Sequence, residues 1–345
     1  MNFIKKGIYF IVLSLVFSVS LLAMEDENEN LSQGKFLIKF AANNSNADSA
    51  KRNINSSLLG FNIEKIEFLG EGFNNTAAIV NDEFVFRFPK RNEVSESLST
   101  EIKILPLLAK RLKIAIPEFI YFGKQEENGF NFVGYRKIPG TALTKELFLD
   151  LPISAKENIF ITLSDFLQNV HSFPVEQAKK LGVTEEDFSN TYKEYWDETK
   201  EKIFPLLGRE FQEKLGEFFQ NYLSDDSNFK YEPSLLYADF SPEHILFDTE
   251  VKRIRGIIDW GDLTVGDPDY DLMYLYQNYG DEFIRSFLNY YPHNNAKKLI
   301  EKLKFFSICD EIDTIISFGQ KLGQTENIEP ALSELKKKLI IWSRT

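Results

Sequence analysis

Two aspartates, Asp239 and Asp259, closely follow short hydrophobic segments at Leu235 to Tyr237 and Ile254 to Ile258. A side chain at the end of a buried strand is held rigidly at the edge of a cleft. Phosphoryl transfer from a nucleotide needs a carboxylate that accepts the proton of the attacking hydroxyl, and further ligands for Mg²⁺. We therefore predict that Asp239 is the catalytic base and that Asp259 is the main Mg²⁺ ligand. Because only 20 residues separate them, we expect both on adjacent strands of one hairpin-like unit.

His244 comes five residues after Asp239, where protein kinases place a metal-binding asparagine. Imidazole is a poorer partner than oxygen for the hard Mg²⁺ ion. The sequence therefore leaves two roles open for His244: direct ligation of Mg²⁺, or a hydrogen bond that orders the catalytic loop. Asp262 and Asp267 are expected to be structural and to bind backbone amides.

The elements that must position these groups begin with residues 58–140, which we predict to form five strands and one helix. The helix should begin near Glu101, with Ser99 or Thr100 as its cap. This order of elements is that of the amino-terminal lobe of a kinase. The expected strands, marked by alternating or aromatic runs between turns, are Ile63–Leu69, Ala77–Val80, Phe84–Phe88, Phe119–Phe122 and Phe130–Lys137.

This first region should also bind the nucleotide. Arg87, in the third strand, is expected to contact phosphate oxygens in a bidentate fork and to pair with Glu101. The alternatives are an exposed strand arginine and a first-turn acid favoured by the helix dipole. Gly70, Gly72 and Asn74 would form the loop over the phosphates.

Residues 141–345 are predicted to form a larger, mainly helical lobe that carries the two aspartate loops. The connection between the lobes, with Tyr135 and Ile138, would offer backbone groups to a purine, and it does not distinguish ATP from GTP. His171 ends an apolar helical stripe and is expected to be structural, donating to a backbone carbonyl or to the Asp259 loop. Cys309 is expected to be a core thiol.

The sequence resembles the aminoglycoside phosphotransferase family, most closely its 2''-phosphotransferase branch, which also carries a histidine in the asparagine position. The resemblance extends from Leu58 to the C-terminus. It rests on the runs Asp239 to Asp248, Gly256 to Asp262 and Gly266 to Asp271, with Leu69 to Asn75, Phe86 to Lys90 and Gly134 to Gly140 on the amino-terminal side.

This resemblance implies an α+β, protein-kinase-like fold with a small antiparallel β-rich lobe and a larger helical lobe. It implies transfer of the γ-phosphoryl of ATP or GTP, with Mg²⁺, to a hydroxyl of a small polar acceptor, with a cationic aminoglycoside, as in antibiotic resistance, as the leading candidate. In this family acids bind the ammonium groups of the acceptor. The residues that would do so here are Glu194, Asp197, Glu198, Asp310 and Glu311.

Three alternatives stay open. The acceptor could be an amino alcohol or sugar of ordinary metabolism, because the wider family includes such kinases. The chain could be a nucleotide-binding pseudokinase, since His244 and Arg87 depart from the common kinase residues. The candidate substrate acids could be no more than solvated helix faces.

Composition limits the other function classes. The 345 residues carry a net charge of −12, which argues against a nucleic-acid partner because phosphates require a basic face. A single cysteine, Cys309, excludes an internal disulfide framework. Oligomeric state is not indicated.

The amino-terminal end of the sequence predicts a different cellular location from the rest of the chain. Residues 1–23 have a basic start and a short apolar run, which predicts a signal peptide or signal-anchor. Residues 24–57 read as a polar linker or amino-terminal extension, and a short helix on either side of Asn43 to Asn46 stays open. A membrane contact is expected only through residues 1–23, if they are not cleaved. This end indicates export or anchoring, whereas nucleotide chemistry indicates the cytoplasm, so the sequence leaves the location open.

Overall fold

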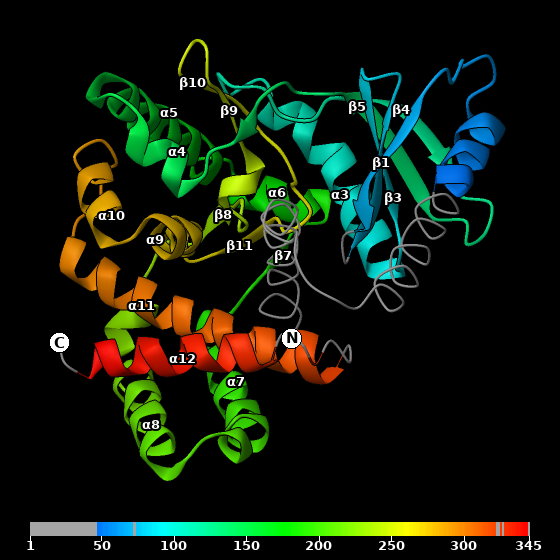
Figure 1. Cartoon of the computed structure of the whole chain (residues 1–345). Coiled ribbons are helices and arrows are strands. Elements are labelled where there is room, and N and C mark those ends of the chain that lie inside the picture. Colours follow the sequence, from blue (N-terminus) through cyan, green and yellow to red (C-terminus); the bar gives the residue numbers. More distant parts are fainter. Residues whose placement is uncertain (1–46, 72–73, 322–324, 326–327, 344–345) are drawn as a thin grey trace, which may run out of the picture.

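The computed structural model of the chain describes residues 47–71, 74–321, 325 and 328–343. The predicted signal segment, residues 1–23, lies outside the described residues, as does the predicted linker up to residue 46. Figure 1 shows a β-rich small lobe beside a larger helical lobe, as the sequence predicts. Among the described residues, no helix is both long enough and apolar enough to cross a membrane.

The small lobe is built on a five-stranded antiparallel sheet in the order β1-β2-β3-β5-β4. Asn81 and Asp82, with φ of 55° and 57°, form the tight turn between β2 and β3. The five predicted strands are confirmed, although the first begins at Ile66 and not at Ile63. The strands are β1 (Ile66–Glu71), β2 (Asn75–Val80), β3 (Phe84–Pro89), β4 (Phe119–Lys124) and β5 (Asn131–Arg136).

One face of this sheet is an aromatic core. The period-two pattern turns Phe84, Phe86 and Phe88 of β3 into it, where Phe132 of β5 joins them. Residues 47–57 form a helix that covers this core, and its Ile54 is fully buried there. Residues 47–57 therefore belong to the small lobe, so the predicted boundary at residue 58 is wrong, whereas a helix does follow Asn46, as the sequence left open.

The helix of the small lobe is longer than predicted. Helix α3 spans Asn92–Leu108 and begins after Arg91, with no side-chain cap. The predicted start near Glu101, capped by Ser99 or Thr100, is wrong, because the polar first turns also follow helical spacing and bury Ser95 and Leu98. Glu101 consequently lies in the middle of α3, on its buried face.

The large lobe is mainly helical, as predicted. Figure 1 shows α12 running along α11, with α7 and α8 below them. The helices are α4 (Lys145–Asp150), α5 (Ile153–His171), α6 (Val175–Leu181), α7 (Phe188–Lys202), α8 (Arg209–Leu223), α9 (Met273–Tyr279), α10 (Asp281–Phe287), α11 (Ala296–Asp313) and α12 (Ile328–Trp342), with a π-helical segment at Thr314–Lys321.

Two small sheets in this lobe carry the predicted catalytic groups. One has the order β10-β9-β6 and the other β7-β11-β8. Asp239 follows β8 and Asp259 follows β10, so the prediction that they share one hairpin is wrong; β8 pairs with β11, and β9 pairs with β10. The strands are β6 (Thr141–Ala142), β7 (Thr184–Glu185), β8 (Ser234–Leu236), β9 (Ile245–Asp248), β10 (Arg253–Ile257) and β11 (Thr264–Gly266).

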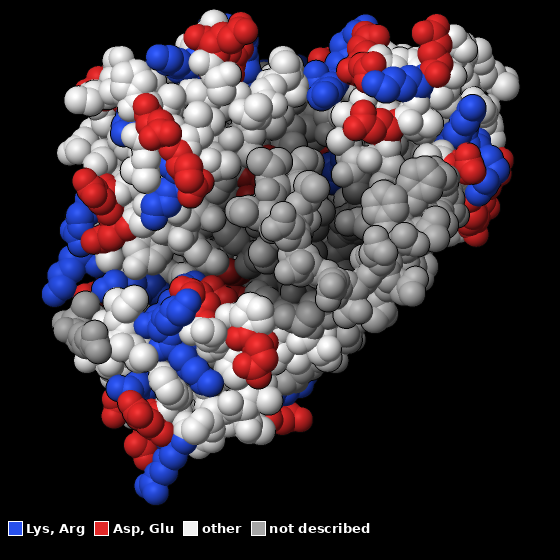
Figure 2. Space-filling view, viewed as in Figure 1, with Lys and Arg blue, Asp and Glu red and all other residues white. Residues whose placement is uncertain are grey.

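The surface agrees with the acidic composition. Figure 2 shows acidic and basic side chains interspersed over the face that is drawn, without a broad basic area among its coloured residues.

Candidate active site

The segment 237–244, which we call the catalytic loop, leaves β8 in a constrained conformation. Ala238 has a φ of 70°, a left-handed value that a residue with a Cβ adopts at a cost. The carboxylate of Asp271 accepts hydrogen bonds from both neighbouring amides, Ala238 N at 2.5 Å and Tyr237 N at 3.1 Å. These bonds fix the backbone next to Asp239.

The side chain of Asp239 is only partly engaged. Its Oδ1 accepts a hydrogen bond from Ser241 Oγ at 3.1 Å. Its Oδ2 lies 3.3 Å from His244 Nδ1, yet it is buried and accepts no hydrogen bond from the described residues. A buried carboxylate oxygen without a donor is suited to accept the proton of a substrate hydroxyl.

His244 immediately precedes β9 and lies between the two aspartates. Its Nδ1 lies 3.0 Å from the Asp239 carbonyl oxygen and 3.0 Å from Ser241 Oγ. Its Nε2 lies 3.9 Å from Asp259 Oδ2. One ring nitrogen therefore orders the catalytic loop, while the other faces the predicted metal ligand.

The donor set around Asp259 fits Mg²⁺. Among the described residues there is no group of three or more His, Cys, Asp or Glu side chains arranged for a metal. Mg²⁺ in nucleotide sites usually takes one or two carboxylates and fills its remaining positions with phosphate oxygens and water. Asp259, with His244 beside it, matches that pattern.

Burial and the neighbouring charges shift the titration of this group. Desolvation raises the pKa of Asp239 to about 7, against the lowering effect of His244 and with a further increase from Asp259. Burial alone would lower the pKa of His244, but the carboxylates of Asp239 and Asp259 outweigh it, so the pKa is raised. The arrangement therefore retains a proton near neutral pH.

Arg87 joins the small lobe to the loop 259–262, which we call the metal loop. Its Nη1 lies 2.8 Å from Glu101 Oε2, and its Nη2 lies 3.3 Å from Glu101 Oε1 and 3.4 Å from Asp259 Oδ1. The side chains of Arg87 and Glu101 are only 8% and 2% exposed. The predicted pair is present, and the alternatives of an exposed arginine and a first-turn acid are wrong.

Two contacts near the nucleotide loop were not predicted. Arg91 donates to the side chain of Asn74 at 2.5 Å, and Ser97 of α3 donates to the carbonyl oxygen of Gly261 in the metal loop. The only sequence signal was their closeness to Arg87 and Glu101. A cavity of about 40 Å³ lies between these groups, lined in part by Asn74, Arg87, Arg91 and Asp259.

The remaining predicted nucleotide-binding residues are distributed along this lobe. Gly70 lies within β1, one residue before its end, and not in a loop, and Gly72 lies outside the described residues. Tyr135 of β5 is buried against Phe119, and burial raises its pKa to about 12, so its side chain is part of the core. Ile138 follows β5 in the connection to the large lobe, where only its backbone is a candidate for purine binding.

The candidate substrate acids separate into two groups. Burial raises the pKa of Tyr195, and the charges of Asp313, Asp310 and Glu198 raise it further; its hydroxyl donates to the carbonyl oxygen of Cys309 at 2.6 Å and links α7 to α11. Both predicted acids have partners of their own: Glu198 pairs with Lys202 at 2.7 Å, and the buried Asp310 accepts a hydrogen bond from Gln277 at 2.9 Å. Asp313 was not among the predicted acids, although it stands in the same run as Asp310.

The other three acids do not join this group. Glu311 is buried in an ion pair with Lys338 at 2.6 Å. Glu194 and Asp197 are exposed on α7, where Asp197 pairs with Lys200 at 2.7 Å.

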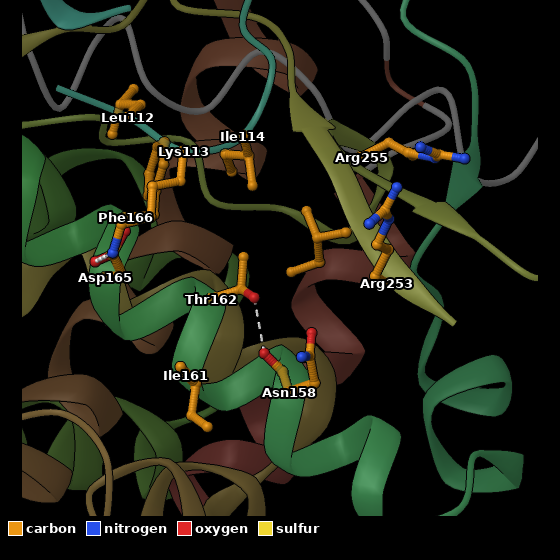
Figure 3. Close-up of a pocket in the computed structure, with 11 residues that line it drawn as sticks. Leu112, Lys113, Ile114, Asn158, Ile161, Thr162, Asp165, Phe166, Arg253 and Arg255 are labelled. Atoms are coloured by element: carbon orange, nitrogen blue, oxygen red, sulfur yellow. Dashed lines mark hydrogen bonds and ion pairs between the residues drawn. The ribbon is translucent and has the colours of Figure 1, made fainter. Parts of the chain in front are cut away.

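A larger cavity of about 420 Å³ lies elsewhere, between α5 and β10 (Figure 3). None of the predicted site residues lines it. Three of its charged side chains are paired: Lys113 and Asp165 with each other at 2.6 Å, and Arg255 with Asp248 at 2.5 Å. Size alone therefore does not identify the active site, because the groups with chemical function gather at Asp239.

Comparisons with known proteins agree with this geometry. The sequence pattern of the phosphotransferase enzyme family matches residues 65–306. The GDP complex of wild-type aminoglycoside 2'-phosphotransferase-IIIa is 32% identical, with a TM-score of 0.81 over 86% of this chain and 99% of that one. The GDP and kanamycin complex of an aminoglycoside 2''-phosphotransferase is 33% identical, with a TM-score of 0.80 over 84% and 97%. An uncharacterised protein of Bacillus subtilis, YcbJ, is 25% identical over 73% of this chain and 82% of its own length.

Proposed function

We propose that this chain, which belongs to the phosphotransferase enzyme family, moves the γ-phosphoryl of ATP or GTP to a hydroxyl of an aminoglycoside. Its membership of the family and its similarity to enzymes solved with GDP make it a nucleotide-dependent phosphotransferase. The observation that carries the proposal is the buried Asp239 carboxylate, which is held by Ser241 at one oxygen and has no donor among the described residues at the other.

Asp239 would orient the acceptor hydroxyl and receive its proton. Desolvation raises the pKa of Asp239 to about 7, which places the carboxylate near the value at which a base works best at neutral pH. The bond between the hydroxyl oxygen and the γ-phosphorus would form as the bond to the β-phosphate oxygen breaks. Asp239 would then carry the proton, and the nucleoside diphosphate would leave.

Asp259 would hold Mg²⁺, with His244 at its side. When bound, the ion supplies charge neutralisation at the β- and γ-phosphates. Arg87 would contact the phosphates while Glu101 keeps its guanidinium in place. Arg87 also lies 3.4 Å from Asp259, so the groups proposed to bind phosphate and metal would act side by side.

The acceptor is proposed from the comparisons. Two of the similar structures are of aminoglycoside phosphotransferases, one of them a complex with kanamycin. This similarity favours an aminoglycoside over a neutral sugar. The candidate acids Glu198 and Asp310 do not add to the argument, because Glu198 pairs with Lys202 at 2.7 Å and the buried Asp310 accepts hydrogen bonds from Gln277 and Tyr274.

The test is transfer from ATP or GTP, with Mg²⁺, to a panel of acceptors. We expect a phosphorylated aminoglycoside, and much weaker transfer to the same compound after its amino groups are acetylated. The acetylated compound is the matched control because it keeps every hydroxyl. Transfer only to amino alcohols or neutral sugars would contradict the aminoglycoside proposal, and nucleotide binding without transfer to any acceptor would contradict the proposed reaction.

A further inference from the structure

A second layer of hydrogen bonds lies behind the catalytic loop. Asp271 binds the amides of Tyr237 and Ala238 and so holds the left-handed φ of Ala238. A carboxylate can hold two amides in a fixed direction only if its own orientation is fixed. The contacts of Asp271 with side chains are therefore relevant to the geometry of Asp239.

His171, the last residue of α5, makes such a contact. Its Nε2 lies 2.8 Å from Asp271 Oδ2, and its Nδ1 lies 3.0 Å from the hydroxyl of Tyr291. A neutral ring that donates from Nε2 and accepts at Nδ1 satisfies both partners. The side chains of His171 and Asp271 are 9% and 0% exposed, so water is largely excluded from this hydrogen bond.

Three parts of the large lobe thus meet behind the loop. His171 comes from α5, Asp271 from the turn before α9, and Tyr291 from the segment after α10. The expectation that His171 bonds a carbonyl or the Asp259 loop is wrong, because the ring faces Asp271. Phe166 of α5 also packs against Tyr237, but this apolar contact does not orient the Asp271 carboxylate.

We propose that His171 is a positioning residue for the catalytic base. It orients Asp271, which holds the backbone of Tyr237 and Ala238 and so sets the direction of the Asp239 carboxylate. The inference rests on the proposed function for the role of Asp239. The stabilisation of the catalytic loop by Asp271 and His171 does not depend on that function. Removing the hydrogen bond from His171 should loosen the loop while the binding of nucleotide is retained.

The test compares His171→Leu with His171→Gln. Leucine removes both hydrogen bonds, whereas the glutamine amide can still donate to Asp271. We expect His171→Leu to lower kcat by about 10–100-fold, the usual effect of losing a group that orients a functional ligand, with an unchanged KM for nucleotide. His171→Gln should recover most of kcat, and Tyr291→Phe should give an intermediate value. Gln168→Leu, one turn earlier on α5, is the matched control and should keep the full rate.

A double variant separates positioning from general damage. If His171 acts through Asp239, adding His171→Leu to Asp239→Asn should cause no further loss. An equal loss on both backgrounds, or no loss in His171→Leu alone, would overturn the proposal.

Hydrogen exchange makes the test independent of turnover. The peptide that contains Tyr237 and Ala238 should exchange faster in His171→Leu than in wild type, and His171→Gln should restore protection. Unchanged exchange in His171→Leu would overturn the hold on the loop whether or not an acceptor is found. Faster exchange in a protein without transferase activity would instead leave the hold standing and refute only the proposed function.

Discussion

Asp239 combines burial with an oxygen that has no hydrogen-bond donor among the described residues, and this combination makes the residue chemically useful. A solvated aspartate would be a weak base at neutral pH, whereas desolvation raises the pKa of Asp239 to about 7. The nearby His244 counteracts this shift, so the histidine tunes the base as well as ordering its loop.

The first prediction concerns pH. Only the ionised carboxylate accepts a proton, so kcat/KM should fall as the pH is lowered through about 7, the pKa of Asp239. Because His244 lowers the pKa of Asp239, His244→Asn should move this limb to higher pH. The measurement is a pH profile of both proteins at saturating Mg²⁺, and a limb that stays in place or moves to lower pH contradicts the assignment.

The second prediction concerns the buried pair of Arg87 and Glu101. Removing one member of a buried ion pair leaves an uncompensated charge and costs about 3–5 kcal/mol. Arg87→Met should lower the free energy of unfolding by that amount, and adding Glu101→Leu should restore part of it. Urea denaturation measures both. Lys179→Met, which breaks an exposed pair with Glu185, is the control and should have little effect.

The candidate catalytic residues could be selected from the sequence because each stands in a short run of fixed order. The motif order identified Asp239, His244 and Asp259 as candidates, and a strand followed by a helix identified Arg87 with Glu101. The contacts of Arg91 with Asn74 and of His171 with Asp271 were not predictable. They join residues distant in sequence or without a motif, and only the folded chain brings them together.

Among the elements, α3 and helix 47–57 show where periodicity was a poor guide. The polar first turns of α3 hid its start, although Ser95 and Leu98 are buried. The sequence predicts a linker for residues 47–57 because this segment is polar and contains several asparagine and serine residues. In both cases two or three buried side chains fix the helix against the sheet, and tertiary packing outweighs composition.

The third prediction tests the helix 47–57. Ile54 packs into the aromatic core and is fully buried. Ile54→Ala should therefore lower the free energy of unfolding by about 2–5 kcal/mol. Asn55→Ala, on the exposed face of the same helix, is the control. A linker would respond to neither substitution, so equal and negligible changes in both would contradict the packing described here.

At the scale of the whole molecule, two small sheets and the buried Arg87 bring the candidate catalytic groups close together. The sequence predicted both lobes and their order, but it misplaced Asp239 and Asp259 on one hairpin. Spacing along the chain could not reveal that β8 pairs with β11, because the partner strand lies downstream of both aspartates. Pairing between distant strands is decided by packing of the complete lobe.

The fourth prediction concerns net charge. The chain carries −12, so a polycationic acceptor should be attracted over a distance set by the Debye length, about 10 Å at 0.1 M salt and about 3 Å at 1 M. Raising the salt concentration between these values should increase the KM of an aminoglycoside and leave that of the nucleotide little changed. An acceptor KM that is insensitive to salt would contradict recognition by charge.

The most direct measurement of the central claim is single-turnover transfer by wild type and by Asp239→Asn, after nucleotide affinity has been shown to be equal. The substitution keeps the shape of the side chain and removes its capacity to accept a proton. We predict a rate about 10²–10⁴-fold lower in the variant, the usual contribution of a general base. Transfer at the wild-type rate by Asp239→Asn would contradict the account.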